Sequence, residues 1–473
     1  MIEFLQSVLA LIVTISILVT VHEFGHFYVA KKCGVHVERF SVGFGKVLFR
    51  LQGKPPKVDQ GIAANGPRTV SNEPLAGTEY CIAMIPLGGY VKMLDERDSL
   101  VADDLQRFAF NRKSLWQRTL IVGAGPMANF ILAFFVYWLL FIAGVSGVAP
   151  ILGEPLPGSP AERVALKAGS EIVNVDGKPT VTWSEVNLAL FDRLGDTGTI
   201  ELVVRPDPPL SGLQNASLPI ARFLAGQDEP RPATALGLRL KQPVMAPILG
   251  EISPGSPADI AGLKAGDQIT MADGVALSAW SDFVALVQAR ADKTVALRVK
   301  RDESEVYLAV TPEAVVTPDG TIGRIGVALG PQQWPASMQR VIRAPFYTAW
   351  LPAIDKTYEM TRFTLESIGK MLRGLVSTRN LSGPITIAKI ANQTAGNGLE
   401  SFLGFIALVS ISLGVLNLLP IPMLDGGHLL YFFIEGLTGK PVSERIQTWG
   451  LQIGMVFLVG IMMLAFYNDL LRL

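Results

Sequence analysis

Five consecutive residues near the N-terminus place two histidines and a glutamate on little more than one helical turn: His22-Glu23-Phe24-Gly25-His26. Histidines at positions i and i+4 share one helical face, so both imidazoles can bind the same Zn²⁺. The glutamate between them can take a proton from metal-bound water, whose pKa the metal lowers to about 7. We therefore predict a zinc site at His22 and His26, with Glu23 as the catalytic base.

The composition favours a membrane protein. Of 473 residues, 49% are hydrophobic and only 17% are charged, whereas a soluble chain of this size carries about a quarter charged residues. The formal net charge is zero, so the chain shows no basic excess for nucleic acid, and we expect no such partner. Two cysteines, Cys33 and Cys81, are too few for a disulfide scaffold.

Four apolar runs are long enough to cross about 30 Å of hydrocarbon, which makes the expected class a multi-pass α-helical membrane protein. They are residues 1–30, 117–144, 399–425 and 449–467. The first run lacks the basic start and cleavage site of a secretory signal, so we expect an uncleaved anchor. Lys31 and Lys32 follow it, and the positive-inside rule places this end in the cytoplasm. Residues 31–116 and 426–448 are then cytoplasmic, and both termini lie outside.

The third zinc ligand has to come from another part of the chain, because a catalytic zinc takes three protein ligands and a water. Our prediction is Asp425, at the end of the third apolar run. The first and third runs cross the membrane in the same direction, so their cytoplasmic ends meet. His428, one turn further on, is the alternative ligand; its other possible role is to cap a cytoplasmic helix.

Two amides stand inside apolar runs, Asn129 and Asn417. One interpretation is hydrogen bonding between helices, which contributes about 0.6 to 2 kcal/mol. The other is substrate binding, with Asn417 holding the backbone of an unwound substrate where Pro420 and Pro422 break the helix. The residues alone do not decide between these roles, and we predict all four as substrate-binding residues.

The cytoplasmic segment contains a hairpin signature at residues 80–94, where two apolar, β-prone runs flank Gly88-Gly89. Such a hairpin is too short to span, so we predict that it dips into the membrane beside the metal site. Its edge, including Gly88 and Gly89, would pair with an unwound substrate strand. A plain cytoplasmic hairpin is the alternative. Residues 54–78, rich in Pro, Gly and Asn, are predicted to form a flexible inserted loop.

The segment between the second and third runs contains an internal repeat. Residues 151–183 align without gaps to residues 248–280 at an offset of 97, which brings Trp183 onto Trp280. Two copies are too few for a solenoid. The repeated pattern resembles PDZ domains, which implies two extracytoplasmic α/β domains at 147–241 and 244–332.

Residues 333–398 follow these domains and space their apolar residues as an amphipathic helix does. We predict helices that lie on the membrane surface. Packing of the same helices against the neighbouring PDZ domain is the alternative.

The motifs in combination resemble the site-2 protease family of intramembrane zinc metalloproteases. The resemblance is carried by the H-E-x-x-H motif of the first run and by Asn417-x-x-Pro420-x-x-x-x-Asp425-Gly426 of the third. Gly125-Pro126-x-x-Asn129 in the second run and the paired PDZ domains narrow it to the four-span bacterial branch. This resemblance implies His22, His26 and Asp425 as zinc ligands, Glu23 as the catalytic residue and Asn417 as a substrate contact.

The same resemblance implies regulated proteolysis in the bacterial inner membrane. Substrates would be single-span proteins cut near the cytoplasmic face: anti-sigma factors already trimmed outside, in an envelope-stress response, and remnant signal peptides. The PDZ domains would be periplasmic, where they exclude bulky substrates or bind the new C-terminus of a trimmed one. The competing hypotheses are a non-catalytic membrane scaffold that displays PDZ domains and a metal transporter. Only the protease needs the Glu23 carboxylate for activity while metal stays bound.

Overall fold

The structure is a computed structural model that describes residues 2–54, 76–97, 101, 105–207, 212–302, 304–317, 320–330 and 334–472. The loop predicted at residues 54–78 lies almost entirely outside these described residues, so the prediction for it stays open.

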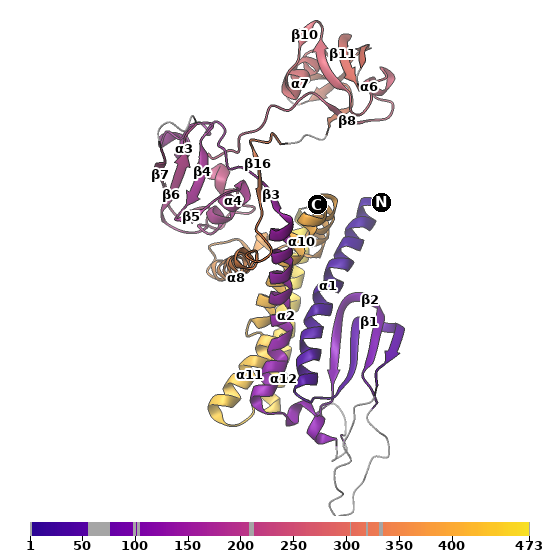
Figure 1. Ribbon diagram of the computed structural model, residues 1–473, viewed down its shortest axis with the longest axis vertical. Coiled ribbons are helices and arrows are strands. Elements are labelled where there is room, and N and C mark those ends of the chain that lie inside the picture. Colours follow the sequence, from indigo (N-terminus) through magenta and orange to yellow (C-terminus); the bar gives the residue numbers. More distant parts are fainter. Residues whose placement is uncertain are drawn as a thin grey trace, which may run out of the picture.

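Four long apolar helices confirm the prediction of four spans. Within the described residues, the helices long and apolar enough to cross a membrane are α1 (Ile2–Lys32), α2 (Leu115–Ala143), α10 (Leu399–Leu418) and α12 (Glu444–Leu471). Ser114 begins α2 with a capping box, because its hydroxyl accepts from Gln117 N–H while the Gln117 side chain accepts from Ser114 N–H. Figure 1 shows the four helices side by side, with both termini at the end from which the α/β units project.

The third span ends earlier than predicted. Helix α10 stops at Leu418, and Asp425 is the first residue of a separate helix, α11 (Asp425–Thr438). The sequence-based boundaries 399–425 and 426–448 were therefore wrong. Proline lacks a backbone N–H and disfavours helical backbone in the residue before it. Pro420 and Pro422 therefore end α10 and separate it from α11.

The predicted hairpin at residues 80–94 was wrong in its pairing. Strand β2 (Glu79–Met93) forms a sheet with β1 (Val37–Gln52), and Ser41 pairs with Tyr90 on one side and with Cys81 on the other. The start of β1 therefore lies between the two halves of β2, which do not pair across Gly88-Gly89. A Gly-Gly turn signal indicates where a chain bends, but it does not indicate which strand enters between the two arms.

The sheet packs against the C-terminal half of α1, beside which Figure 1 draws it. Phe27 of α1 makes edge-on ring contacts with Phe40 of β1 and Tyr80 of β2, at centroid distances of 5.3 and 5.8 Å. Ala30 and Val37 are fully buried in the same cluster. Two short 3-10 turns, Gln106–Phe108 and Phe110–Arg112, lead from the sheet to α2.

The internal repeat folds into two α/β units with equivalent sheets, of order β5-β4-β6-β7 and β10-β9-β11-β12. The first contains α3 (Pro160–Arg163), β4 (Glu171–Val175), β5 (Lys178–Pro179), α4 (Trp183–Phe191), β6 (Gly198–Arg205), β7 (Gln214–Ile220) and α5 (Pro232–Leu236). The second contains β8 (Leu249–Ile252), α6 (Pro257–Ile260), β9 (Gln268–Ala272), β10 (Val275–Ala276), α7 (Trp280–Gln288), β11 (Val295–Arg301), β12 (Ser304–Val310), β13 (Glu313–Thr317), β14 (Gly320–Arg324) and β15 (Val327–Leu329). Equivalent turns hold Asp176 at φ 50° and Asp273 at φ 48°, at the same offset.

A two-stranded ribbon joins these units to the helices, because β3 (Val145–Val148) pairs with β16 (Gln339–Ile342). Helix α8 (Trp350–Leu372), a 3-10 turn at Thr378–Asn380 and α9 (Pro384–Gly396) follow.

One face of α8 is buried and another is exposed. Ala353 and Met360 enter a core with α2 and α10, while Leu351, Ile354 and Tyr358 are exposed. At its far end, Lys370 donates to the backbone carbonyl of Asp192 in the first α/β unit. The packing predicted as an alternative is thus present, and the predicted contact with the membrane surface stays a prediction.

Candidate metal centre

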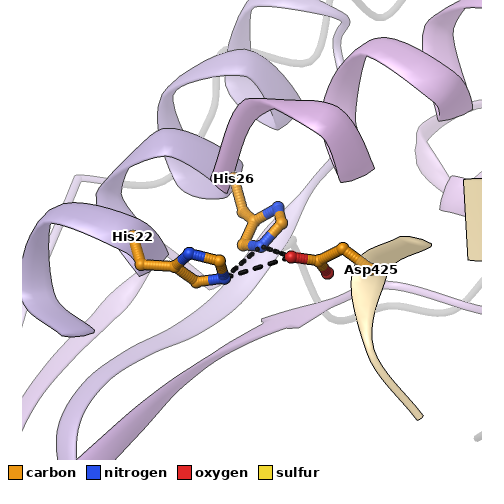
Figure 2. Close-up of side chains that lie close together, drawn as sticks. All are labelled: His22, His26 and Asp425. Atoms are coloured by element: carbon orange, nitrogen blue, oxygen red, sulfur yellow. Dashed lines mark hydrogen bonds and ion pairs between the residues drawn. The ribbon is translucent and has the colours of Figure 1, made fainter. Parts of the chain in front are cut away.

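Three side chains from two distant parts of the chain converge inside the helix bundle. His22 and His26 project from one face of α1, and Asp425 projects toward them from the first residue of α11 (Figure 2). Asp425 Oδ2 lies 3.1 Å from His22 Nε2 and 3.5 Å from His26 Nε2. The two Nε2 atoms are 3.2 Å apart. Within the described residues, His428 does not belong to this group.

Helix α2 contacts the Nδ1 atoms of both imidazoles. His26 Nδ1 lies 2.9 Å from the carbonyl oxygen of Ile121. A carbonyl only accepts, so Nδ1 carries the proton and Nε2 keeps its lone pair for the interior of the site. His22 Nδ1 lies 3.1 Å from the side-chain amide of Asn129. Both rings are therefore turned so that their Nε2 atoms face Asp425.

Two glycines allow α1 and α2 to approach this closely. A Cβ atom at Gly25 would lie 2.3 Å from the backbone oxygen of Ala124. A Cβ atom at Gly125 would lie 2.2 Å from His26 Nε2 and 2.9 Å from His22 Cε1. Any larger residue at Gly125 would occupy the space of the imidazoles, which gives the Gly125-Pro126-x-x-Asn129 pattern a physical meaning that the sequence did not show.

The three ligand atoms fit a zinc ion. Two imidazole nitrogens and a carboxylate oxygen form a catalytic zinc set, with bonds of about 2.0 to 2.2 Å. Tetrahedral ligands at about 2.1 Å lie about 3.4 Å from one another, close to the observed separations of 3.1 to 3.5 Å. Among the described residues, Asp425 Oδ2 is buried without a hydrogen-bond donor and has the two imidazoles as neighbours, as expected of a metal ligand.

Comparison with known proteins agrees with this chemistry. The sequence pattern of peptidase family M50 matches residues 10–64 and 57–461. The regulator of sigma-E protease RseP of Escherichia coli is 42% identical over 475 residues, covering all of both chains. Protease RseP of Yersinia pestis is 41% identical over 474 residues, again covering both chains fully.

The chain belongs to peptidase family M50. It is a zinc metalloprotease and a multi-pass membrane protein. Among solved structures, the PDZ domain of an SdrC-like protein from Listeria monocytogenes matches 19% of this chain and 90% of that chain, at 24% identity and a TM-score of 0.16. A likeness of this size supports no conclusion about the fold.

In this M50 peptidase Glu23 stands beside the metal ligands and faces the β-sheet. The backbone N–H of Val91 in β2 lies close to its carboxylate, and a Cβ atom at Gly89 would lie 3.3 Å from Glu23 Cγ. Gly88 makes room in a similar way, because a Cβ there would lie 2.0 Å from the ring of Phe44. The second half of β2 thus borders the site through backbone rather than through side chains.

The other predicted site residues have different surroundings. Asn417 is half-buried on the last turn of α10, and Pro420 and Pro422 lie between it and Asp425. Asn129 is fully buried and contacts His22, so here the alternative of a hydrogen bond between helices is what the structure shows.

Two glycines of α12 were missed by the sequence analysis. Cβ atoms at Gly450 and Gly454 would lie 3.4 and 2.0 Å from atoms of Pro422. Helix α12 therefore packs directly on the segment between α10 and α11, just before Asp425. The signal was present as a G-x-x-x-G spacing in an apolar run, a pattern that favours close helix contacts.

Proposed function

We propose that this M50 peptidase hydrolyses the transmembrane segments of single-span membrane proteins near the cytoplasmic face, as part of sigma-E regulation. The observation that carries the proposal is the convergence of His22, His26 and Asp425 within a bundle of apolar helices. Its place in sigma-E regulation rests on the full-length similarity to the Escherichia coli regulator of sigma-E protease. A non-catalytic scaffold is not favoured, because the chain belongs to a peptidase family.

Zinc, when bound by His22, His26 and Asp425, supplies a Lewis acid that lowers the pKa of a water and polarises the substrate carbonyl. Glu23 takes a proton from the attacking water and passes it to the leaving amine, so that one peptide bond breaks while a carboxyl group and an amine form. Helix α2 contacts the Nδ1 side of both imidazoles, so their Nε2 atoms are the ones that would bind the zinc.

The sheet beside Glu23 is suited to hold an unwound substrate. A transmembrane helix keeps its carbonyls in internal hydrogen bonds, so it must open before water can attack. Residues Gly88–Met93 form an outer strand of the sheet next to Glu23, and strand addition there would present substrate backbone to the site. The exposed apolar side chains of Leu48, Phe49 and Ile82 fit a sheet that dips into the bilayer.

Asn417 lies in the last turn of α10, and Pro420 and Pro422 lie in the segment that leads from it to Asp425. We assign Asn417 the role of a clamp on the opened substrate backbone, because its amide can donate and accept at once. The two prolines interrupt the helix after Asn417, and the chain turns before Asp425, where Leu424 N–H donates to the carbonyl of Ile421.

The two α/β units fit tandem PDZ domains that lie in the periplasm and act as a size filter. Both project from the end of the bundle that carries the termini (Figure 1), and the positive-inside rule, applied to Lys31 and Lys32, favours a cytoplasmic location for the other end. A bulky outer domain on a substrate would collide with them, whereas a trimmed stub would pass. Trimmed anti-sigma factors and remnant signal peptides in the inner membrane are therefore the proposed substrates.

Cleavage of a model single-span protein by the purified chain in lipid vesicles tests the proposal. Mass spectrometry of the products should place the cut inside the transmembrane segment, in the half nearer the cytoplasm. A zinc chelator should abolish the products, and added Zn²⁺ should restore them. A cut outside the membrane segment, or one that persists in the chelator, would contradict the proposal.

A further inference from the structure

The side chain of Asn129 has a hydrogen-bonding conflict at the metal centre. Asn129 lies on α2 and is fully buried. Its Nδ2 lies 3.1 Å from His22 Nδ1, while its buried Oδ1 has no hydrogen-bond partner among the residues that the structure describes. A buried amide oxygen without a partner costs about 1 to 3 kcal/mol, so this arrangement asks for an explanation.

The chemistry of His22 supplies one. Its Nε2 faces Asp425 and His26 in the ligand group, so a neutral His22 that binds the metal carries its proton on Nδ1. That proton needs an acceptor, and in metal sites the second nitrogen of a histidine ligand almost always finds one. An NH₂ group of Asn129 at this position would place two N–H donors, its own and that of His22 Nδ1, opposite each other without an acceptor.

We propose that Asn129 is a positioning residue that accepts the Nδ1–H of His22 through Oδ1. The oxygen and nitrogen of an amide have nearly the same shape, and turning the amide by half a rotation exchanges them. This rotation gives His22 an acceptor and gives Oδ1 a donor, and it moves the NH₂ group to the position that Oδ1 occupies in the structure. The proposal rests on the zinc site of the proposed function and adds a residue that orients one of its ligands.

The surroundings of Asn129 support a fixed positioning role. Ser410 of α10 donates its hydroxyl to the backbone oxygen of Asn129 at 2.8 Å, which ties this turn of α2 to a third helix. On the same helix, the carbonyl of Ile121 does for His26 what Asn129 does for His22. Helix α2 thus supplies one acceptor for each histidine ligand and sets the tautomer of both.

Zinc affinity, measured by chelator competition on the intact chain, separates this role from others. Asn129→Leu keeps the volume but removes the acceptor, and it should weaken zinc binding by about 10- to 100-fold. Asn129→Asp keeps an acceptor, since a carboxylate only accepts, and it should hold zinc within about threefold of the wild type. Ser410→Ala removes only the hydrogen bond to the Asn129 backbone and leaves the side-chain acceptor in place, so it is the matched control and should weaken zinc binding much less than Asn129→Leu does.

Two outcomes of these measurements would overturn the proposal. Equal zinc affinity in Asn129→Leu, with KM raised in a cleavage assay, would make Asn129 a substrate contact. Zinc affinity in Asn129→Asp as low as in Asn129→Leu would show that the amide does not act as an acceptor. If Asn129→Leu does not fold, Asn129→Asp alone decides, together with the visible spectrum of its Co²⁺ form, which should match that of the wild type. Because zinc affinity is read without cleavage, failure of the proposed protease activity is seen separately.

Discussion

At the scale of single residues, the metal centre combines a local pattern with a contact that spans most of the chain. His22 and His26 could be assigned from their spacing of four, which any helix would bring to one face. Asp425 could be assigned only from the direction in which two spans cross the membrane and from the family resemblance of the motif that contains it. The structure brings all three together, and their roles are open to direct test.

Removing the third ligand should release the metal. Asp425→Ala is expected to lower zinc occupancy well below one per chain, because two imidazoles alone form an incomplete zinc set. His428→Ala is expected to leave occupancy unchanged, since His428 is not part of the group formed by the described residues. Metal analysis of both purified variants decides, and the reverse pattern would assign the ligand to His428.

Gly125 is expected to tolerate no side chain. In Gly125→Ala the new methyl group would lie 2.2 Å from His26 Nε2, so the imidazole has to move and zinc occupancy should fall. Gly123→Ala, two residues away, is the matched control, because a Cβ there meets no atom within 4 Å. Both variants can be compared by zinc content and thermal stability; unchanged zinc in Gly125→Ala would show that the site adapts.

The residues that sequence analysis could not assign share one feature: their roles depend on contacts between segments. The spacing of Gly125 and Asn129 marks a pattern, but only the structure shows that one leaves room for the imidazoles and the other contacts His22. Helical periodicity says which face a residue occupies and nothing about the atoms opposite that face.

At the scale of elements, long periodic segments were predictable and pairing was not. The four spans and the repeated α/β units follow from apolar runs and from an offset of 97. The end of α10 was missed, although Pro420 and Pro422 carried the signal. The hairpin was missed because strand pairing is non-local, and β1 enters between the two halves of β2.

The second α/β unit depends on a buried ion pair that makes its stability sensitive to acid. Burial alone would raise the pKa of Asp267, but hydrogen bonds from Arg301 and from Lys264 N–H lower it below its usual value of 3.8. A lowered folded-state pKa gives stability that is complete above the usual value and is lost as the pH falls through the lowered one.

Asp267→Asn should therefore weaken this unit at neutral pH by about 2 kcal/mol, since a hydrogen bond to a charged group is lost. The difference from the wild type should shrink as the pH falls, because the wild-type carboxyl then becomes neutral as well. Urea unfolding of the intact chain, followed at β9 and β11 by hydrogen-exchange mass spectrometry, measures the loss of stability at neutral pH and its change with pH. The exposed neighbour substitution Asp302→Asn should change stability by less than about 0.5 kcal/mol; an equal loss there would refute the ion-pair account.

At the scale of the whole molecule, the sheet of β1 and β2 and the α/β units lie toward opposite ends of the bundle (Figure 1). This separation is the reason we propose that the units control the admission of substrates rather than align the scissile bond. The ribbon of β3 and β16 holds Val148 opposite Gln339, so the chain leaves the bundle and returns to it at one place. This arrangement permits both units to be removed without pulling the helices apart.

Deleting residues 150–330 and joining the ends with a short linker should remove the filter. We expect this variant to cut a substrate that still carries a folded outer domain, and to cut trimmed substrate as before. Deletion of residues 244–332 alone is the partial control and should relax the filter less. Zinc content and thermal stability establish that each variant is intact. Loss of cleavage of trimmed substrate by an intact variant would instead assign substrate recognition to the units.

The most direct test of the account is the substitution Glu23→Gln, with zinc content and cleavage of a single-span substrate measured on the same preparation. The amide keeps the shape of the side chain but cannot take the proton of the attacking water. We predict about one zinc per chain, as in the wild type, and a rate of cleavage lower by about 10² to 10⁴ or more. Cleavage near the wild-type rate by the zinc-loaded variant would contradict the account.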